Sequence, residues 1–426
     1  MRASGWICLS GVVACGIALV GCGNFNPRDE QAQAGLPAVP GMDSSGGEDT
    51  DAAGDGAADS GGGADGGSSG GADGPRFDVG TDDEGPATSC NTPPDFDDDG
   101  DGFTESMGDC NDCDPNVNPG AIEVIIPEPD EQGNVATPAD ENCDGIVDNA
   151  PQPCDGGAAL ADSDPSAAAA AMGLCKSFED DSPWGITSVQ YVRADGSPLA
   201  SSTQNGIMTG FGTNVASQEG TQMLALSTGH SRTPGQADPC NSQTCPMTGA
   251  GSAPAGFPQD VPACPGDSDI YDDIALEVTM VAPTNATGFA FNFNFFSFEY
   301  PEWVCTSYND QFVAIVDPAP PGSINGNVSF DSMTNPVSVN IAFFEVCSGC
   351  PLGTDELAGT GFDTWNSAGG TSWLETTSPV QGGQEVTIRF LIWDTGDQAY
   401  DSTVLIDNFR WIADGGTVAV GTTPVG

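Results

Sequence analysis

Basic residues are scarce in this 426-residue sequence, which has 8 Lys and Arg residues against 62 Asp and Glu residues. The formal net charge is -54 at pH 7, and His230 and Lys176 are the sole histidine and lysine. Nucleic acid is therefore excluded as a partner, because its phosphates would be repelled over most of the surface. The same charge attracts divalent cations, and so acidic a chain requires local neutralisation in order to fold.

Catalytic signatures are also scarce. A single histidine excludes an HExxH zinc site and makes any Ser-His-Asp triad depend on His230, which lies in a turn-rich loop. No nucleophile elbow, phosphate-binding loop or dinucleotide fingerprint occurs in a strand-to-helix context. We therefore expect a non-enzymatic protein. Paired carboxylates are abundant, so the alternative is a secreted carbohydrate-active hydrolase on a jelly-roll scaffold, with Glu299 and Glu302 as the first pair to test.

One apolar run, from Trp6 to Val20, opens the chain and is shorter than the ~20 residues that span a bilayer. Residues 1–21 therefore predict an export signal. The sequence Leu19-Val20-Gly21-Cys22 resembles the lipobox of bacterial lipoproteins. The resemblance implies a lipid on Cys22 that holds the protein to a membrane, and Gly23 favours the outer membrane or cell surface. An ordinary secretory signal, cut elsewhere, is the alternative.

Large apolar residues are almost missing from residues 22–89, which consist mainly of Gly, Ala, Ser and Asp. Such a segment buries too little area to offset backbone entropy, and we expect a disordered tether. Twelve cysteines follow Cys22, and an even set in an exported chain predicts disulfides whose pairing the sequence leaves open. They are Cys90, Cys110, Cys113, Cys143, Cys154, Cys175, Cys240, Cys245, Cys264, Cys305, Cys347 and Cys350.

Residues 90–155 form an acidic, cysteine-rich module in which D-x-D-x-D-G places carboxylates around a tight turn, as calcium requires. Two registers fit, Asp95–Gly100 and Asp97–Gly102, and we prefer the second because Phe103 then takes the apolar seventh position. A second copy, D-x-N-x-D-G, begins at Asp140. Both lack the bidentate glutamate of an EF-hand, so we expect modest affinity. The candidate metal ligands are Asp97, Asp99, Asp101, Glu105, Asp109, Asp112, Asp114, Asp140, Asn142, Asp144 and Asp148.

The module resembles a metal-binding repeat of myxobacterial surface proteins. The resemblance rests on Asp97–Phe103, Gly108–Pro115, Asn118–Glu123 and Asn142–Asp148. The repeat is named after a copper-binding surface protein of a methanotroph. Copper favours imidazole or sulfur ligands, and the sole histidine, His230, lies outside this acidic module, so we expect Ca²⁺ in place of copper. A solvated acidic loop held only by disulfides is the alternative.

Beyond the module the sequence becomes typical of β-strands. Residues 156–176 predict an Ala-rich linker or short helix, residues 177–413 a β-domain, and residues 414–426 a loose tail. Short β-branched and aromatic runs bounded by turn residues predict an antiparallel β-sandwich or jelly roll. The expected strands include Ile274–Val281, Gly288–Phe295, Gln311–Val316, Val337–Val346, Glu385–Trp393 and Val404–Trp411.

Two stretches of the β-domain resemble the choice-of-anchor L domain of bacterial surface proteins. They are Phe298–Val316 and Leu391–Asp407, with Leu226–Gly229 upstream. The resemblance implies surface display and adhesion, with a cell-surface polysaccharide or protein as the ligand, but names no substrate.

Acidic residues of this domain converge on a second candidate calcium site at one end of the sandwich, unless they simply form turns. They are Glu299, Glu302, Asn309, Asp310, Asp394, Asp397 and Asp401. Five tryptophans of the domain are expected in the core, with a sugar-stacking platform as the alternative. They are Trp303, Trp365, Trp373, Trp393 and Trp411.

Overall fold

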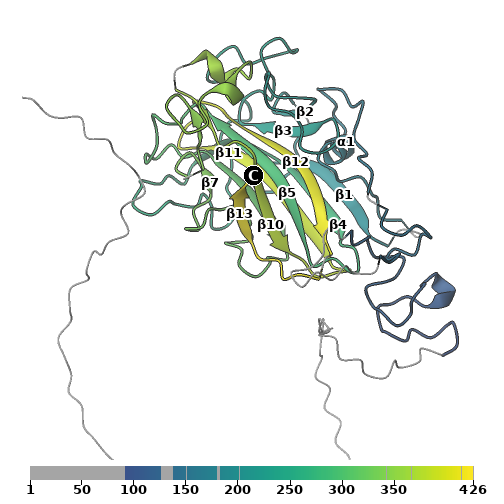
Figure 1. The fold of residues 1–426 in the computed structure, drawn as a ribbon. Coiled ribbons are helices and arrows are strands. Elements are labelled where there is room, and N and C mark those ends of the chain that lie inside the picture. Colours follow the sequence, from purple (N-terminus) through teal and green to yellow (C-terminus); the bar gives the residue numbers. More distant parts are fainter. Residues whose placement is uncertain are drawn as a thin grey trace, which may run out of the picture. The chain divides into compact units, whose positions relative to one another are not determined.

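The computed structural model describes residues 92–125, 138–149, 151–179, 183–200, 202–341, 343–365, 367–413 and 415–425. The expected signal and tether, with Cys22, lie outside the described residues. Within the described ranges the chain is mainly β-structure in two antiparallel sheets, as the sequence predicts (Figure 1). Helical segments are short: α1 (Pro165–Ala170) and the 3-10 helices η1 (Glu105–Met107), η2 (Asp355–Leu357) and η3 (Phe362–Thr364).

The two sheets form a sandwich with strand orders β1-β4-β11-β6-β7 and β13-β10-β5-β12-β3-β2; β9 pairs with β5, and β8 with β9. The first sheet comprises β1 (Gly185–Val192), β4 (Ile270–Val281), β6 (Gln311–Asp317), β7 (Val337–Ser338) and β11 (Glu385–Thr395). The second comprises β2 (Asn205–Met208), β3 (Met223–Ser227), β5 (Gly288–Ser297), β8 (Val346–Cys347), β9 (Gly369–Gly370), β10 (Leu374–Pro379), β12 (Ser402–Ile412) and β13 (Gly421–Pro424).

Strand β5 supplies much of the core, and every one of its residues is buried. Its alternating phenylalanines face the first sheet, where the rings of Phe293 and Phe312 lie 4.9 Å apart. Because successive residues of a strand face opposite sides, Phe296 points the other way. Its ring packs 5.2 Å from that of Phe211, in a second apolar cluster beneath the loops. The Phe-x-Phe pattern of the sequence therefore reflects a strand covered on both faces.

The segment 156–176, predicted as a linker or short helix, contains the short helix α1 and is part of the packed structure. Asp164 accepts a hydrogen bond from the backbone N–H of Ser166 and caps the short helix α1. Ala169 and Met172 are fully buried in the main core. Alanines have small side chains that let a helix approach a sheet closely, a role that composition does not distinguish from that of a spacer.

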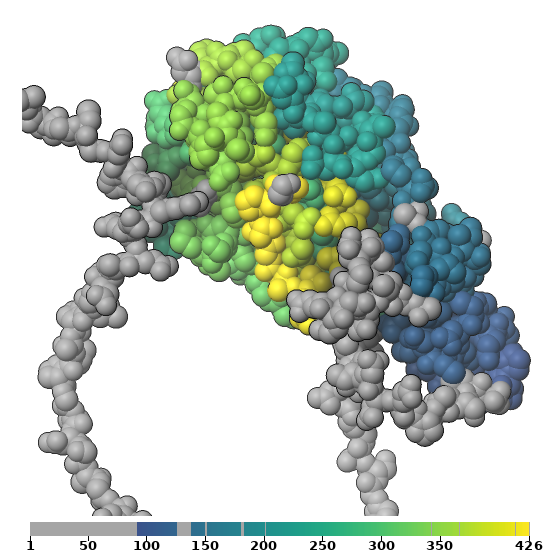
Figure 2. All heavy atoms as spheres, in the orientation of Figure 1, coloured from purple at the N-terminus to yellow at the C-terminus, as the bar shows by residue number. Residues whose placement is uncertain are grey.

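Residues 414–426, predicted as a loose tail, contain a strand. β13 pairs with β10, and the hydroxyl oxygens of Thr376 and Thr422 lie 2.8 Å apart. In Figure 2 the yellow C-terminal residues lie on the surface of the sandwich. The expectation of a loose tail was wrong. Residues 421–424 are Gly, Thr and Pro with no apolar alternation, and pairing with β10 makes them a strand.

The predicted strand Val337–Val346 is interrupted. Only its two ends are strands, the two-residue β7 and β8. Between them the backbone N–H of Asn340 donates to Oδ1 of Asn309 at 3.1 Å. The side chain of Asn340 in turn accepts a hydrogen bond from the backbone N–H of Cys305. These side-chain contacts hold the segment in a turn despite its apolar composition.

Disulfides are present, as the even cysteine count predicts. The pairs are Cys110–Cys143, Cys154–Cys175, Cys240–Cys245, Cys264–Cys305 and Cys347–Cys350. Cys113 is disulfide-bonded as well, and Cys90 lies outside the described residues.

Candidate metal centres

The first acidic loop turns around Asp97. The carboxylate of Asp97 accepts hydrogen bonds from the backbone N–H groups of Gly100 at 2.6 Å and Gly102 at 3.1 Å. Both glycines have positive φ angles, +85° and +99°, which other residues rarely adopt. The turn therefore runs from Asp97 to Gly102, and Asp95 stays exposed outside it.

Three carboxylates of this loop and the following segment are each oriented by one backbone N–H. Oδ1 of Asp99 accepts from the N–H of Asp101 at 3.1 Å, and Oδ1 of Asp109 accepts from Asn111 at 2.8 Å. Oδ1 of Asp112 accepts from the N–H of Asp98 at 2.9 Å. Each carboxylate therefore uses one oxygen to fix its direction.

The remaining oxygens of these three carboxylates have no hydrogen-bond partner. Oδ2 of Asp99, Asp109 and Asp112 is buried and unpaired, and Asp109 and Asp112 are only 5% and 4% exposed. Oxygens of the three carboxylates lie within 4.8 Å of one another. Calcium binds oxygens at about 2.3–2.6 Å, so ligands on opposite sides of one ion are about this far apart.

The charges of this group are poorly compensated. Burial raises the pKa of Asp99 to about 6, and the neighbouring carboxylates of Asp109 and Asp112 contribute to the rise. Burial likewise raises the pKa of Asp109. Asp101, whose oxygen lies within 4.8 Å of those of Asp97 and Asp99, has its pKa raised by burial to about 6. A bound cation would remove this penalty.

Two predicted ligands of the first site are not part of this group. Glu105 is exposed at the start of η1, and its side chain is close enough to Asp112 to interact with that carboxylate. Oδ1 of Asp114 accepts hydrogen bonds from the backbone N–H and the side chain of Asn116, at 3.1 and 3.0 Å, and closes a turn of its own. Neither residue belongs to the carboxylate groups found among the described residues.

The second loop repeats the turn of the first. Asp140 accepts from the backbone N–H groups of Asp144 at 3.0 Å and Gly145 at 2.8 Å. Oδ1 of Asn142 accepts from the same N–H of Asp144 at 2.9 Å, so the first two predicted ligands lie together. The carboxylate of Asp144 itself accepts from the side chain of Asn149 at 2.7 Å.

Asp148, the fourth predicted ligand of this loop, joins a different group. Oxygens of Glu123, Glu141 and Asp148 lie within 4.8 Å of one another. The carboxylate of Glu123 is held by the backbone N–H groups of Asn142 at 3.2 Å and Asp148 at 2.9 Å, and burial raises its pKa. The spacing rule of the D-x-N-x-D-G loop does not include Glu123 and Glu141. Glu123 does end one of the four segments that carry the resemblance to the metal-binding repeat.

Three of the seven candidate ligands in the β-domain lie near one another, although their carboxylate oxygens are not all within 4.8 Å of one another. Glu299 follows β5, Asp310 precedes β6 and Asp394 lies near the end of β11, so all three meet at one end of the sandwich. They are 1%, 0% and 1% exposed. Burial raises the pKa of Asp310 to about 7 and places those of Glu299 and Asp394 well above the usual range.

The other four candidates have different contacts. Asn309 accepts from Asn340, as described above, and Asp397 accepts from the backbone N–H of Ala399 at 2.9 Å, as a turn former does. Glu302 is exposed, 3.3 Å from the hydroxyl of Ser367.

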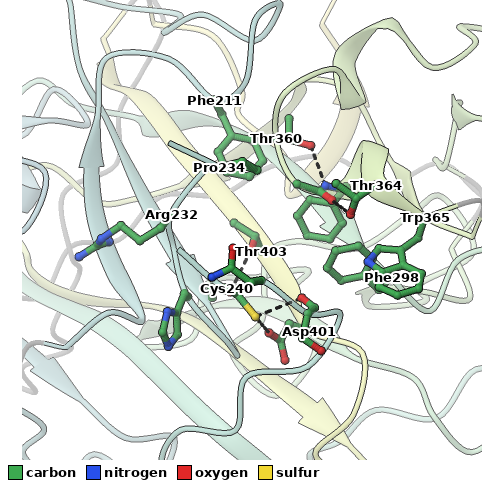
Figure 3. Close-up of a pocket in the computed structure, with 16 residues that line it drawn as sticks. Phe211, Arg232, Pro234, Cys240, Phe298, Thr360, Thr364, Trp365, Asp401 and Thr403 are labelled. Atoms are coloured by element: carbon green, nitrogen blue, oxygen red, sulfur yellow. Dashed lines mark hydrogen bonds between the residues drawn. The ribbon is translucent and has the colours of Figure 1, made fainter. Parts of the chain in front are cut away.

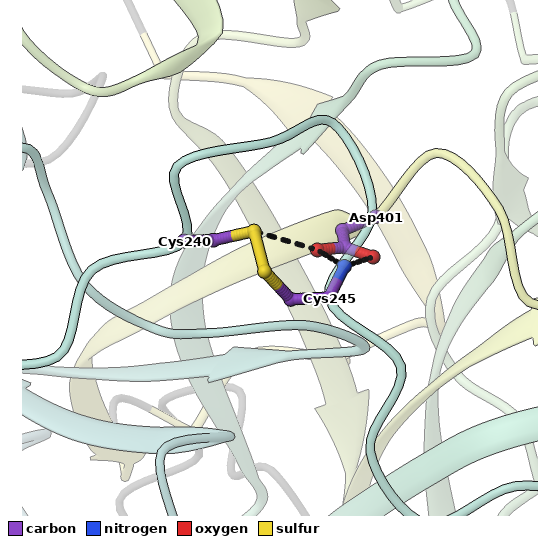
Figure 4. A group of neighbouring side chains, drawn as sticks. All are labelled: Cys240, Cys245 and Asp401. Carbon is purple, nitrogen blue, oxygen red and sulfur yellow. Dashed lines mark hydrogen bonds between the residues drawn. A yellow bond between two sulfur atoms is a disulfide. The ribbon is translucent and has the colours of Figure 1, made fainter.

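Asp401, the fourth, lies against a disulfide. Its carboxylate accepts from the backbone N–H of Cys245 at 3.0 Å and lies beside the Cys240–Cys245 bond (Figure 4). These sulfurs are bonded to each other, so the group offers no thiolate to a metal. Asp401 also packs against Gly229, where an added Cβ would lie 1.8 Å from its Oδ2. Asp401 therefore holds the loop that contains Cys245 and the loop that contains Gly229 in place.

A cavity of about 240 Å³ opens beside Asp401. Its lining includes Phe298, Phe362 and Trp365 together with Arg232, and Figure 3 shows Trp365 beside Phe298. The rings of Phe298 and Phe362 stack 4.3 Å apart. The cavity therefore combines an aromatic wall with a few polar groups.

The five tryptophans do not form one surface. Trp393 is fully buried, and Trp303, Trp373 and Trp411 are partly buried against their neighbours. Trp365, with 48% of its surface exposed, is the exception, and it lines the cavity.

Residues 179–409, more than half of the chain, match the choice-of-anchor L domain. The chain belongs to the choice-of-anchor L family. It is accordingly a cell-surface β-sandwich protein. No curated protein and no solved structure matches it. Among the described residues, no helix is long and apolar enough to cross a bilayer.

The choice-of-anchor L domain holds strands β1 to β11 and most of β12. The buried carboxylates of Glu299, Asp310 and Asp394 and the aromatic cavity all belong to it. The acidic module lies outside the matched residues but is hydrogen-bonded to the domain. Asn285 and Ile122 exchange two hydrogen bonds of 3.0 and 2.8 Å between them.

Proposed function

We propose that the chain is a lipid-anchored cell-surface protein whose acidic module binds calcium and whose β-sandwich binds a ligand, without catalysis. One observation carries the calcium proposal: the buried, unpaired Oδ2 atoms of Asp99, Asp109 and Asp112. An unsatisfied buried carboxylate oxygen is costly, and a cation is the partner that suits three at once.

Calcium fits this donor set better than a transition metal does. The ligands are oxygens, which a hard cation prefers. The cysteines of the described module are disulfide-bonded, and His230 lies outside it. No Lys or Arg occurs between Arg76 and Lys176, so the module contains no side-chain cation of its own. The compensating charge therefore comes from solution.

Isothermal titration of the full chain in detergent with calcium tests this proposal. We expect binding with a dissociation constant of about 10⁻⁴–10⁻³ M, as in other extracellular calcium modules. Asp109→Asn with Asp112→Asn should weaken it by at least about tenfold, because each removes a charged ligand. Asp95→Asn changes the charge of an exposed neighbour and is the matched control. Equal heats for all three proteins, or no heat at all, would contradict the proposal.

The lipid anchor has its own test. Cells supplied with a labelled fatty acid should incorporate the label into the protein, and Cys22→Ser should abolish incorporation and release the protein into the medium. A Cys22→Ser protein that stays with the membrane would show that something else holds it there.

The aromatic cavity is the place where a ligand would bind. A half-exposed indole beside stacked phenylalanines suits the apolar face of a sugar ring. A glycan array probed with the wild-type protein and Trp365→Ala should show signals that the substitution removes. Trp373→Ala, which changes a partly buried tryptophan outside the cavity, is the control. Release of free sugar that Glu299→Gln or Glu302→Gln abolishes would establish the hydrolase instead.

A further inference from the structure

The buried end of the β-sandwich contains a second group of carboxylates with an unusual contact pattern. Asp310 joins the two sheets: its Oδ1 accepts from the backbone N–H of Thr395 in β11 at 3.0 Å, and its Oδ2 accepts from the hydroxyl of Ser402 in β12 at 2.6 Å. The backbone N–H of Asp310 points at Oε2 of Glu299, 3.5 Å away. These contacts place Glu299 and Asp310 side by side between the sheets.

Asp394 completes the group and is only 1% exposed. Neither of its buried carboxylate oxygens accepts a backbone hydrogen bond or a side-chain hydrogen bond of ordinary geometry, and its polar side-chain neighbours are the hydroxyl of Thr228 and the carboxyl group of Asp310. Its neighbour Thr395 donates to Asp310, so the two carboxylates flank one peptide unit. Asp310, Asp401 and Glu299 are the charged groups that act on it, and all three are acids.

No basic side chain among the described residues compensates this group. The three ion pairs there join Arg193 to Asp273, Arg389 to Glu277 and Arg410 to Glu375. None of them includes a carboxylate of this group. Arg232, a buried guanidinium of the same domain, donates instead to the backbone oxygens of Asn205 and Ser231 at 2.7 and 2.6 Å.

We propose that Glu299, Asp310 and Asp394 bind one divalent cation, of the calcium class, between the two sheets. The two oxygens of Asp394 form one side of the site. Glu299, which follows β5, and Asp310, which precedes β6, would turn their carboxylates toward the same ion, since a carboxylate oxygen that accepts one hydrogen bond keeps a lone pair for a metal. This site is separate from the acidic module, and either can exist without the other.

The cation would order the aromatic cavity. Phe298, next to Glu299 in the chain, lines the cavity, and so does Asp401, next to the Ser402 that donates to Asp310. An ion at the carboxylates would hold β5, β6, β11 and the start of β12 in one arrangement. Ligand binding in the cavity would then depend on the metal.

Terbium, which replaces calcium and emits when a nearby tryptophan is excited, tests the site in the full chain. Trp393 is fully buried and adjacent to Asp394, whereas residues 90–155 contain neither Trp nor Tyr. Tryptophan-sensitised emission therefore reports on the sandwich site in preference to the module. We expect emission on adding terbium and its loss on adding excess calcium.

Asp394→Asn keeps the size of the side chain and should reduce terbium affinity by at least about tenfold. Glu299→Gln should do the same and provides the test if Asp394→Asn fails to fold. Asp397→Asn removes a half-buried carboxylate whose charge acts on Glu299 and Asp310 but which closes a turn of its own, and it should reduce terbium affinity less than Asp394→Asn does. Asp109→Asn with Asp112→Asn should also leave this emission unchanged, which separates the site from the module.

The metal-free proteins give a second readout. Asp394→Asn should melt at a higher temperature than the wild type in EDTA, because a neutral amide replaces a buried, uncompensated charge. The proposal is overturned if both Asp394→Asn and Glu299→Gln retain wild-type emission, or if the wild type gives none while its module still binds calcium.

Discussion

The acidic module and the β-sandwich both gather carboxylates, but by different routes. In the module, Asp99, Asp109 and Asp112 lie close in sequence, and nearby backbone N–H groups orient them. In the sandwich, Glu299, Asp310 and Asp394 come from three distant segments, and strand pairing brings them together. Local turns build the first group and the hydrophobic core builds the second. The two groups should therefore respond to different perturbations.

The largest effect is expected from the core. Phe293→Ala removes a fully buried ring that packs against Phe312, and should lower the free energy of unfolding of the sandwich by about 3–5 kcal/mol. Urea denaturation followed by tryptophan fluorescence measures this change, since residues 90–155 contain no tryptophan. Calcium affinity of the module should stay unchanged. A parallel loss of that affinity would show that the module depends on the sandwich core.

The reverse experiment removes the covalent link within the module. Cys110 and Cys143 lie 33 residues apart and join its two acidic loops. Their double replacement by serine should destabilise the module by about 3–4 kcal/mol through the entropy of the opened chain. Limited proteolysis should then cleave the module in EDTA while the sandwich stays intact. A module that resists cleavage in EDTA would mean that its other contacts are enough to hold it.

A change of pH should act on both regions, because buried carboxylates with raised pKa values occur in the module and in the sandwich. Burial raises the pKa of Asp310 and Asp401 to about 7, from an ordinary value of 3.8. Their contribution to stability is therefore fully present below pH 3.8 and is lost as the pH rises through about 7. Carboxylates such as Asp195, whose pKa a hydrogen bond from Ser197 lowers, oppose this trend.

We expect the free energy of unfolding in EDTA to fall by roughly 2–3 kcal/mol from pH 4 to pH 7. Thermal melts across this range measure the change. Calcium should restore stability near neutral pH, and Asp394→Asn should flatten the profile. A free energy of unfolding that rises with pH in EDTA would contradict the raised pKa values of these carboxyl groups.

The smallest effect concerns the contact between the two regions. The side chain of Asn118 donates to Asp101 at 2.7 Å and accepts from the hydroxyl of Thr284 at 2.8 Å. Thr284→Val removes that hydroxyl and should cost about 1 kcal/mol. Calcium titration should show a weaker module site with an unchanged terbium response. Thr287→Val, on the same connection, is the control, because its hydroxyl bonds to Ile412 at 3.2 Å and not to the module.

The sequence predicts those strands whose own residues form a long β-branched and aromatic run. β4, β5, β6, β11 and β12 are long runs of β-branched and aromatic residues, and all of them are present. β13 is polar and depends on its partner β10. Val337–Val346 has a strand-like composition, but contacts of Asn340 hold it in a turn. Local pattern therefore identifies central strands and fails where tertiary contacts decide.

The same limit applies to the carboxylates. The turns around Asp97 and Asp140 follow from spacing and glycine alone. Glu123 meets Asp148 only because the chain folds back, and no spacing rule includes that pair. In the sandwich the sequence offers seven candidates of equal standing. Only burial and hydrogen bonding separate Asp394, whose buried carboxylate accepts no backbone hydrogen bond, from Asp397, whose carboxylate closes a turn.

The Cys110–Cys143 bond that closes the acidic loops has a consequence for where the protein matures. Thiols stay reduced in the cytosol, so this link forms only after the chain has left the cytosol. Free calcium is also scarce inside cells and plentiful outside them. Without its disulfide and without the proposed calcium ion, the module would stay unfolded and could pass through an export channel. It would fold only in the compartment in which it works.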